Sequence, residues 1–472
     1  MYSIKSIACT VLLAGAALFS ACENDNIDPT ETGNAPSGNT PTGSEEVLKT
    51  ALASYPKGSI VWTKDTTLAA SFKVPEGVSL YIEPGVTVTA ASDADPKVEL
   101  VVLGNLYCMG TADKPVTFTS DKKEAGAWGG VICGKPSTDD ANARVIEQEV
   151  VMNHVDIRYC GAKTNDNSMS FLNKLYKLES GDGVPAFFFG NVDGRFTVTN
   201  CVFRDNKNDQ TYFTGGSCVI YGNVFADSGN SAEGGDVLNF KAGCKGDIAY
   251  NVIYNSCTNG FKLSNSGTDA GFSAAELNIY NNTIVNCGWR RSKNKKGGSI
   301  WAEKGIAPKV ENNLMYDCRY AIKQDEEDGA DMKNGVFTPN YFFSSTADGV
   351  KQNTAEEEGV MQFDTDIRST SAGDKDPLFV KFDRTPGMDI NCSTDDKSKG
   401  APQAFNAAWD FHLKAGSPAL NGKLPAITPL WKNGLVFIGL KKVIFNDINN
   451  DMEYRFYSPA PATYFGAYGL AD

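Results

Sequence analysis

Histidine is almost missing from this chain, which has 2 histidines among 472 residues. Metal sites built from several imidazoles and serine–histidine–aspartate triads both depend on this side chain. Only His154 and His412 are available for either arrangement. Each lies between apolar neighbours in a strand-like segment, so we expect a structural role for both.

Positively charged residues are also few, because the chain has 44 Lys and Arg against 57 Asp and Glu, which gives a net charge of −13. A nucleic-acid binder needs a cationic face to meet phosphates, so this composition argues against a nucleic-acid partner. Charged residues make up only 21% of the chain and aromatic residues 11%. That balance indicates a folded chain and not a disordered one.

Closely spaced cysteine pairs are a third absence. The 12 cysteines are spread singly along the chain, without the Cys-x-x-Cys spacing of zinc sites. Buried thiols that act as small apolar side chains are the favoured interpretation. Cys287 and Cys318 share one position of the repeat described below, and a disulfide between them is the alternative.

The amino-terminal residues have the pattern of a secretory signal. Lys5 precedes the apolar stretch from Ile7 to Phe19, which is too short to span a bilayer comfortably. The sequence Leu-Phe-Ser-Ala-Cys that ends at Cys22 resembles a bacterial lipobox, which implies cleavage before Cys22 and a lipid on its thiol. Acidic residues just after Cys22 resemble the surface-export signal of Bacteroidota lipoproteins. The resemblance implies a lipid-anchored protein of the outer membrane that faces the cell exterior.

These signals divide the chain into three parts. Residues 1–21 are predicted to be the signal peptide, and residues 22–44 a lipidated cysteine with a flexible tether rich in Thr, Gly, Asn, Pro and Ser. Residues 45–472 are predicted to form one domain, which we expect to be a monomer.

An internal repeat organises this domain. The pattern is an asparagine followed two places later by an apolar residue, and it recurs at intervals of 23 to 31 residues. The repeats begin at Asn200, Asn223, Asn251, Asn282, Asn313 and Asn340. The apolar residues expected to stack in the core are Val202, Phe225, Ile253, Ile284, Met315 and Phe342.

The repeats predict a stack of short strands. Each unit is rich in β-forming residues and bounded by Gly, Asn and Asp, and no long helical period follows the tether apart from residues 45–53. Coils of a parallel β-solenoid lie about 4.8 Å apart, so one asparagine per coil can form a ladder of amide hydrogen bonds. We expect an all-β parallel β-helix with a short helical cap at residues 45–53. Residues 421–461 are expected to close the opposite end.

The chain from about Ser59 to its end resembles a known family. The resemblance rests on Gly104–Ser120, Trp128-Gly-Gly130, Asn153–Tyr159, Asp376–Val380, Asp410–Ala419 and Phe465–Gly469. These segments are similar to the pectate-lyase-like, right-handed parallel β-helix proteins found as Bacteroidota surface lipoproteins. The resemblance implies the fold and a polysaccharide partner. This fold hosts lyases, hydrolases and adhesins, so it does not identify one chemistry.

The first candidate site lies in the middle repeats. Lys241 and Lys262 are 21 residues apart, close to one coil, so both can lie on one face. Uronate-cleaving β-helix lyases use a base to remove a proton and a calcium ion held by carboxylates to neutralise the developing charge. Asp236 and Lys241 resemble the Asp/Lys strand of such lyases. This likeness makes Lys241, Asp236 and Lys262 candidate catalytic residues, and Glu233 and Asp236 candidate calcium ligands.

One feature departs from the lyase pattern, and a second interpretation is open. Where such a lyase has a second acidic pair, this chain has Thr258 and Asn259. The alternative is an Asp and a Lys on a solvated sheet face.

Three further groups of side chains are candidate sites. Trp289, Arg290, Arg291 and Trp301, with the lysines at 293, 295 and 296, form a cationic cluster able to bind sulfated or uronate sugars, or else a basic loop. The acidic run Asp325–Asp328 with Asp331 is a loose calcium site or a solvated loop. Asp205, Asp227, Asp236 and Asp317 are carboxylates from which a hydrolase pair could be drawn.

The sequence therefore favours a surface lipoprotein that engages polysaccharide without a defined catalytic activity. A polysaccharide lyase or a glycoside hydrolase is the second interpretation, with the lyase preferred. An adhesin or structural surface protein is the third.

Overall fold

The computed structural model describes residues 55–135, 147–175, 178–229, 234–291, 297–383, 403–440 and 454–471. The predicted signal peptide, lipidated Cys22, tether and helical cap all lie outside these ranges. Among the described residues, no helix has the length and apolar character needed to cross a membrane.

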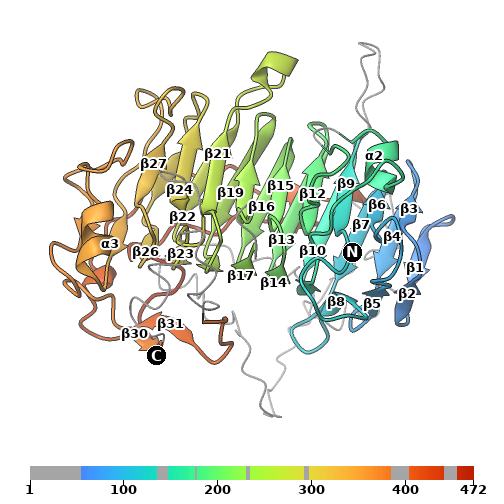
Figure 1. The fold of residues 1–472 in the computed structure, drawn as a ribbon, viewed down its shortest axis with the longest axis horizontal. Coiled ribbons are helices and arrows are strands. Elements are labelled where there is room, and N and C mark those ends of the chain that lie inside the picture. The colour runs from blue at the N-terminus through green and yellow to red at the C-terminus, as the bar shows by residue number, and fades with distance from the viewer. Residues whose placement is uncertain are drawn as a thin grey trace, which may run out of the picture.

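The described chain winds through three parallel sheets, A, B and C, whose strands follow one another in that order in each coil. The coils stack along the long axis of the molecule (Figure 1). This arrangement confirms the predicted all-β parallel β-helix.

Sheet A contains nine strands: β1 (Ile60–Trp62), β4 (Ser79–Ile82), β7 (Asn105–Met109), β10 (Glu149–Asn153), β13 (Arg195–Thr199), β16 (Gly216–Tyr221), β19 (Cys244–Ala249), β22 (Glu276–Tyr280) and β25 (Lys309–Glu311). Sheet B contains eleven: β2 (Thr66–Leu68), β5 (Thr87–Ala90), β8 (Val116–Ser120), β11 (Val155–Arg158), β14 (Val202–Asn206), β17 (Val224–Ser228), β20 (Val252–Tyr254), β23 (Thr283–Val285), β26 (Leu314–Tyr316), β28 (Tyr341–Phe343) and β29 (Ile367–Arg368). Sheet C contains nine: β3 (Phe72–Val74), β6 (Leu100–Val102), β9 (Val131–Gly134), β12 (Phe187–Gly190), β15 (Thr211–Phe213), β18 (Leu238–Phe240), β21 (Asn259–Ser264), β24 (Gly298–Glu303) and β27 (Ile322–Gln324).

In the described ranges, four short helices and two small antiparallel pairs lie outside these sheets. The helices are α2 (Met169–Leu172), η3 (Thr268–Ala270), α3 (Ala347–Gln352) and η5 (Pro418–Leu420). The pairs are β30 (Phe379–Lys381) with β31 (Asp410–Leu413), and β32 (Leu435–Val436) with β33 (Arg455–Phe456).

A ladder of buried asparagines runs along the turn between sheets A and B. In each rung the side-chain Nδ2 donates to Oδ1 of the asparagine one coil later, over 2.8 Å from Asn223 to Asn251, 2.9 Å from Asn251 to Asn282, 2.8 Å from Asn282 to Asn313 and 3.0 Å from Asn313 to Asn340. The same Oδ1 atoms also accept the backbone N–H of the preceding rung. The predicted amide ladder is confirmed for these five residues.

The first predicted rung is wrong by one position. Val202 and Phe203 align with Val224 and Phe225, so Cys201 occupies the place that Asn223 takes one coil later. Asn200 instead has a positive φ of 55° at the corner before it. Phe203 therefore replaces Val202 in the core stack, which continues as predicted through Phe225, Ile253, Ile284, Met315 and Phe342.

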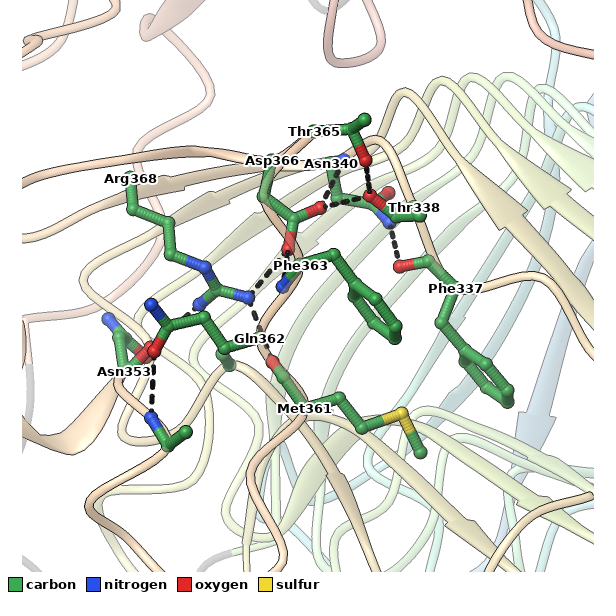
Figure 2. A network of polar contacts seen from close by, with 12 residues as sticks. Phe337, Thr338, Asn340, Asn353, Met361, Gln362, Phe363, Thr365, Asp366 and Arg368 are labelled. Atoms are coloured by element: carbon green, nitrogen blue, oxygen red, sulfur yellow. Dashed lines mark hydrogen bonds and ion pairs between the residues drawn. The ribbon is translucent and has the colours of Figure 1, made fainter. Parts of the chain in front are cut away.

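An aspartate ends the ladder (Figure 2). Asp366 Oδ1 accepts the backbone N–H of Asn340 over 2.9 Å and the hydroxyl of Thr338 over 2.8 Å. Its other oxygen forms an ion pair of 2.7 Å with Arg368, whose guanidinium also donates to two backbone carbonyls. A carboxylate accepts without donating, so it closes the last rung and needs no further coil.

The carboxyl-terminal segment does not close the end of the solenoid, and that prediction is wrong for its described residues. Residues 426–440 run along the outer face of sheet A toward the amino-terminal coils. Their backbone N–H groups donate to three buried carboxylates: Ala426 to Glu311, Trp431 to Asp247, and Ile438 and Gly439 to Glu149. Burial raises the pKa of Asp247 and of Glu311 against these hydrogen bonds.

The described cysteines are free and buried, as the composition predicted. Cys287 and Cys318 stack on successive coils as thiols and not as a disulfide. Burial raises the pKa of the Cys318 thiol well above its ordinary value, so this thiol is unreactive in the folded chain.

Candidate functional site

The outer faces of sheets A and B are largely covered by the carboxyl-terminal part of the chain. On sheet A, Phe437 and Phe456 pack with Tyr81 and Tyr107 in one apolar cluster. On sheet B, the covering residues include Trp409, Phe411 and Phe465. The early coils of sheet C are covered by Leu175, Leu178 and Val184 near α2. The middle coils of sheet C lie outside these three covered regions, and the candidate site lies there.

One column of side chains crosses the outer face of those coils. Tyr212, Asn239, Lys262 and Trp301 are paired in register on the successive strands β15, β18, β21 and β24. Side chains alternate between the two faces of a strand, so the apolar neighbours of Asn239 point into the core while its own amide points outward. This column brings an amide, an ammonium and two aromatic rings together.

A second column lies just before the strands. Asp209, Asp236 and Asn259 follow one another on successive coils, as the neighbouring backbone hydrogen bonds show. Asp209 Oδ1 accepts the backbone N–H groups of Gly235 and Asp236 over 2.8 and 2.9 Å. Asp236 Oδ1 accepts the backbone N–H and the side-chain Nδ2 of Asn259 over 3.1 and 2.8 Å. Each carboxylate is thereby fixed by donors from the next coil.

The turn before Asp236 needs its two glycines. Gly234 and Gly235 have positive φ angles of 76° and 90°. A Cβ added to Gly234 would lie 2.0 Å from the side-chain oxygen of Asn208. A larger residue at this place would displace the chain that carries Asp236.

Asn239 joins the two columns. Its Nδ2 donates to Asp209 Oδ2 over 3.0 Å and lies 3.5 Å from Asp236 Oδ2. Its Oδ1, and that of Asn259, are buried and have no hydrogen-bond partner among the described residues. Since an unpaired buried acceptor is costly, two acceptors are left for a donor that this part of the chain does not supply.

Lys262 supplies positive charge at the same place. Its Nζ lies 3.5 Å from Glu303 Oε1, and Glu303 Oε2 accepts the indole N–H of Trp301 over 2.8 Å. Burial favours the neutral amine, but the carboxylates of Asp236, Glu303 and Asp209 outweigh it and raise the pKa of Lys262. Lys262 is therefore an ammonium at neutral pH and cannot accept a proton as a base. We call Asp209, Asp236, Asn239, Asn259, Lys262 and Glu303 the sheet C cluster.

The carboxyl groups of Asp209 and Glu303 differ in protonation. Burial, and next the charge of Asp236, raise the pKa of Asp209 from 3.8 to about 7. Burial also opposes ionisation of Glu303, but Lys262 and the indole of Trp301 lower its pKa. Near neutral pH, Asp209 thus exchanges a proton while Glu303 stays charged.

The structure places Asp236, Lys241 and Lys262 on neighbouring coils, but Lys262 is aligned with Asn239 and not with Lys241. Lys241 is 4% exposed, and its Nζ lies 5.3 Å from the centre of the Tyr212 ring. Its charge also lowers the pKa of Glu303, which places Lys241 beside the cluster. Glu233 lies outside the described residues.

The predicted calcium ion does not fit the donors present. Calcium takes about six to eight oxygen ligands. In the sheet C cluster the oxygens of Asp209 and Asp236 already accept N–H groups, and the ammonium of Lys262 lies among the carboxylates. No group of three or more His, Cys, Asp or Glu suited to a metal occurs within the described ranges.

The predicted cationic cluster is built into turns. Trp289 is 2% exposed, and its indole N–H donates to the carbonyl of Asp317 over 2.7 Å. Arg290 donates to backbone carbonyls of Ser228 and Asn255 over 2.7 and 2.6 Å. Arg291 is half-buried, and the lysines that follow at 293, 295 and 296 lie outside the described ranges. Trp301 lies apart from these residues, in the sheet C column.

The remaining predicted carboxylates have local partners. Asp227 accepts the backbone N–H of Phe405 over 2.9 Å, and Asp317 accepts the N–H and hydroxyl of Ser345 over 2.6 and 2.7 Å. Asp325 and Asp331 accept backbone N–H groups of their own turns. The two histidines also lie in structural surroundings, since His412 Nδ1 contacts Asp410 at 2.6 Å.

Sequence reasoning missed Asp209, Asn239 and Glu303. Asp209 lies 27 residues before Asp236, which is one repeat interval, so the period could have paired them. Glu303 is aligned with Ser264 across an interval lengthened by the loop after β23, and no spacing rule connects it to Lys262.

Comparison with known proteins supports the fold. The family model described as a pectate-lyase-like β-helix domain matches residues 55–378. Similar solved structures include the pectate lyase Pel9A, at 13% identity over 81% of this chain and 87% of that chain, with a TM-score of 0.37. Another is the catalytic unit of a GH87 α-1,3-glucanase from Streptomyces thermodiastaticus, at 11% identity over 72% of this chain and 69% of that chain, with a TM-score of 0.22. No curated protein matches the chain in sequence.

Proposed function

Because this chain belongs to the family of pectate-lyase-like β-helix domains, we propose that it binds a polysaccharide along the outer face of sheet C, at the sheet C cluster. One observation carries the proposal. In the described coils, sheets A and B are packed against the carboxyl-terminal segment, whereas the middle of sheet C bears charged, amide and aromatic groups in register.

The composition of the cluster suits a sugar. Fixed carboxylates and amides offer directed hydrogen bonds to hydroxyl groups. Lys262, whose side chain is 28% exposed, gives the cluster a group that solvent and ligand can reach.

Retention in native gels that contain polysaccharide tests this proposal. The full-length protein, purified in detergent, is expected to migrate more slowly in gels that contain at least one of the polysaccharides. Lys262→Gln is expected to weaken this binding about tenfold. Lys309→Gln is the matched control, because Lys309 is exposed on sheet A. Equal retardation of wild type and Lys262→Gln would place binding elsewhere.

Cleavage is the second candidate function, and the protonation of Asp209 favours it. A carboxyl group whose pKa is raised by burial to about 7 is suited to act as a general acid in glycoside hydrolysis. For a β-elimination, Lys241 is the candidate base, because Lys262 holds its proton. Reducing ends that disappear in Asp209→Asn would support hydrolysis, and unsaturated ends that disappear in Lys241→Ala would support a lyase. Binding without either product would reject cleavage.

We also propose, from the sequence pattern before residue 23, that Cys22 carries a lipid that anchors the protein to the outer membrane, facing the exterior. Cys22→Ala is expected to move the protein from the membrane fraction to the soluble fraction. Surface proteolysis of intact cells distinguishes the outward face from the periplasmic one. Unchanged membrane retention of Cys22→Ala would reject the anchor.

A further inference from the structure

We infer that the sheet C cluster recognises an uncharged, hydroxyl-rich sugar and does so without a metal ion, with Lys262 supplying the positive charge from within the chain. This inference rests on the proposed polysaccharide binding and names the class of ligand that the site takes. It departs from the calcium-assisted cleavage of uronates, which is the second interpretation of the sequence.

The formal charges of the site argue against a polyanion. Three carboxylates, those of Asp209, Asp236 and Glu303, surround Lys262, and Lys241 lies beside them. The sum is one negative charge, or none when Asp209 holds its proton. A uronate chain would bring more negative charge to a site that has no surplus of positive charge, on a protein of net charge −13.

The neighbouring column residue does not change that sum. Lys323 continues the column after Trp301, but it is 1% exposed. Its Nζ lies 4.4 Å from the centre of the Tyr320 ring, and the backbone at Val360 pairs with it. Lys323 is thus enclosed by its own coil and the segment that follows.

The unpaired atoms of the cluster are acceptors. Asn239 and Asn259 are 3% and 4% exposed, and the Oδ1 of each has no hydrogen-bond partner in the described part of the chain. The carboxylates of Asp209 and Asp236 accept hydrogen bonds from the Nδ2 groups of the same two side chains. A hydroxyl group donates a hydrogen bond to such an acceptor, whereas an ionised uronate carboxylate would add a further acceptor. The hydrogen-bonding pattern therefore favours sugar hydroxyls.

The donors that the structure describes in this cluster do not favour a divalent cation. Asp209 Oδ1 accepts two backbone N–H groups, and Asp236 Oδ1 accepts two N–H groups of Asn259. A cation bound to these oxygens would face the protons of those donors. The ammonium of Lys262 already offsets the charge of Asp236 and Glu303, so the cluster has its counter-charge without an ion.

The test compares neutral and anionic polysaccharides with the same full-length protein. Galactomannan, mixed-linkage glucan and xylan form the neutral group, and polygalacturonate and alginate the anionic group. Each is placed in native gels with calcium chloride or with EDTA. We expect retardation by a neutral polysaccharide, unchanged by EDTA, and weakened about tenfold in Asn239→Leu.

A variant of an exposed asparagine, Asn433→Ala, is the matched control for Asn239→Leu and should bind as wild type does. Should Asn239→Leu fail to fold, Lys262→Gln takes its place, with folding checked by a thermal melt. Retardation by the anionic group alone, or retardation that EDTA abolishes, would overturn this inference and leave polysaccharide binding standing. Wild-type affinity in a folded Asn239→Leu would overturn it too. No retardation by any polysaccharide would overturn both proposals.

Discussion

Two columns of stacked polar side chains run through this molecule, and they differ in how completely their hydrogen bonds are paired. In the ladder between sheets A and B, each asparagine from Asn223 to Asn313 donates to the next rung, and each following Oδ1 accepts two N–H groups. On sheet C, Asn239 and Asn259 each keep a buried oxygen without a partner among the described residues. The ladder pairs its amides within the chain, whereas the sheet C column leaves two oxygens for a donor that the described residues do not supply.

The residue types of the two columns teach the same lesson. The ladder repeats one residue because each coil must satisfy the same corner of the backbone. The sheet C column changes from Tyr212 to Asn239, Lys262 and Trp301, so the solenoid does not require any of them for its period. Side chains that stacking does not explain are the better candidates for function.

The largest expected loss of stability comes from a variant at the end of the ladder, where Asp366 accepts from the last asparagine. Arg368→Met would leave the carboxylate of Asp366, whose side chain is fully buried, without its ion pair. Breaking a buried pair by removing one partner costs about 3–5 kcal/mol, and we expect a loss of that size in the free energy of unfolding from denaturant titration. The double variant Asp366→Asn with Arg368→Met is the control, and it should recover part of the loss. A loss below about 1 kcal/mol for Arg368→Met would show that the ion pair does not hold the last rung.

Removal of an asparagine in the middle of the ladder should reduce the free energy of unfolding somewhat less. Asn282→Ala removes the acceptor of two N–H groups of Asn251 and a donor to Asn313. With about 1–3 kcal/mol for each buried group left unpaired, partly relieved by relaxation, we expect a loss of about 3 kcal/mol in denaturant titration.

The comparison with sheet C sharpens this prediction. Asn239→Leu removes the Nδ2 donor to Asp209 and an oxygen that has no partner in the described chain, which is fewer hydrogen bonds than Asn282→Ala removes, so its loss of stability should be smaller. Asn433→Ala, at an exposed position, should leave stability unchanged. An equal loss for Asn239→Leu and Asn282→Ala would remove the distinction between the two columns.

The pH dependence of the free energy of unfolding should also differ between variants of the two columns, with a smaller effect. The pKa of Asp209 is about 7 in the folded chain and 3.8 as the ordinary value. Between these values the folded state holds a proton that the unfolded state has lost, so stability contributed by Asp209 falls as the pH rises from about 4 to 7. Asp209→Asn should flatten this fall by about 1–2 kcal/mol after solvent screening, whereas Asn282→Ala should keep the wild-type slope. Parallel curves for Asp209→Asn and wild type would contradict the raised pKa.

The sequence predicted the fold well because the ladder is periodic. Five asparagines at regular intervals are enough to indicate stacked coils, and the structure pairs all five. The phase of the first repeat was wrong because Asn200 and Asn223 look alike in sequence, although Asn200 lies one residue early, at the corner.

The sequence predicted the site only in part. Asp236 and Lys241 lie one coil before Lys262, and this spacing is visible in the sequence, but the register pairs Lys262 with Asn239 and not with Lys241. Glu303 reaches Lys262 only through the register of β21 with β24, and the packing of residues 426–440 on sheet A depends on buried carboxylates far away in sequence. Such contacts depend on three-dimensional stacking that no local pattern records.

The smallest expected effect comes from extending the ladder by one rung. Cys201 occupies the rung before Asn223, where its N–H donates to Asn223 Oδ1 over 2.8 Å and its Sγ lies 3.4 Å from the backbone nitrogen of Val155. In Cys201→Asn, the new Oδ1 can accept the N–H of Val155 and the new Nδ2 can donate to Asn223. Replacing weak sulfur contacts by amide hydrogen bonds should stabilise the chain by about 1 kcal/mol, seen as a higher denaturation midpoint. Cys201→Ser, which lacks the reach to Asn223, should give no gain, and a loss of stability in Cys201→Asn would mean that the amide does not fit the first rung.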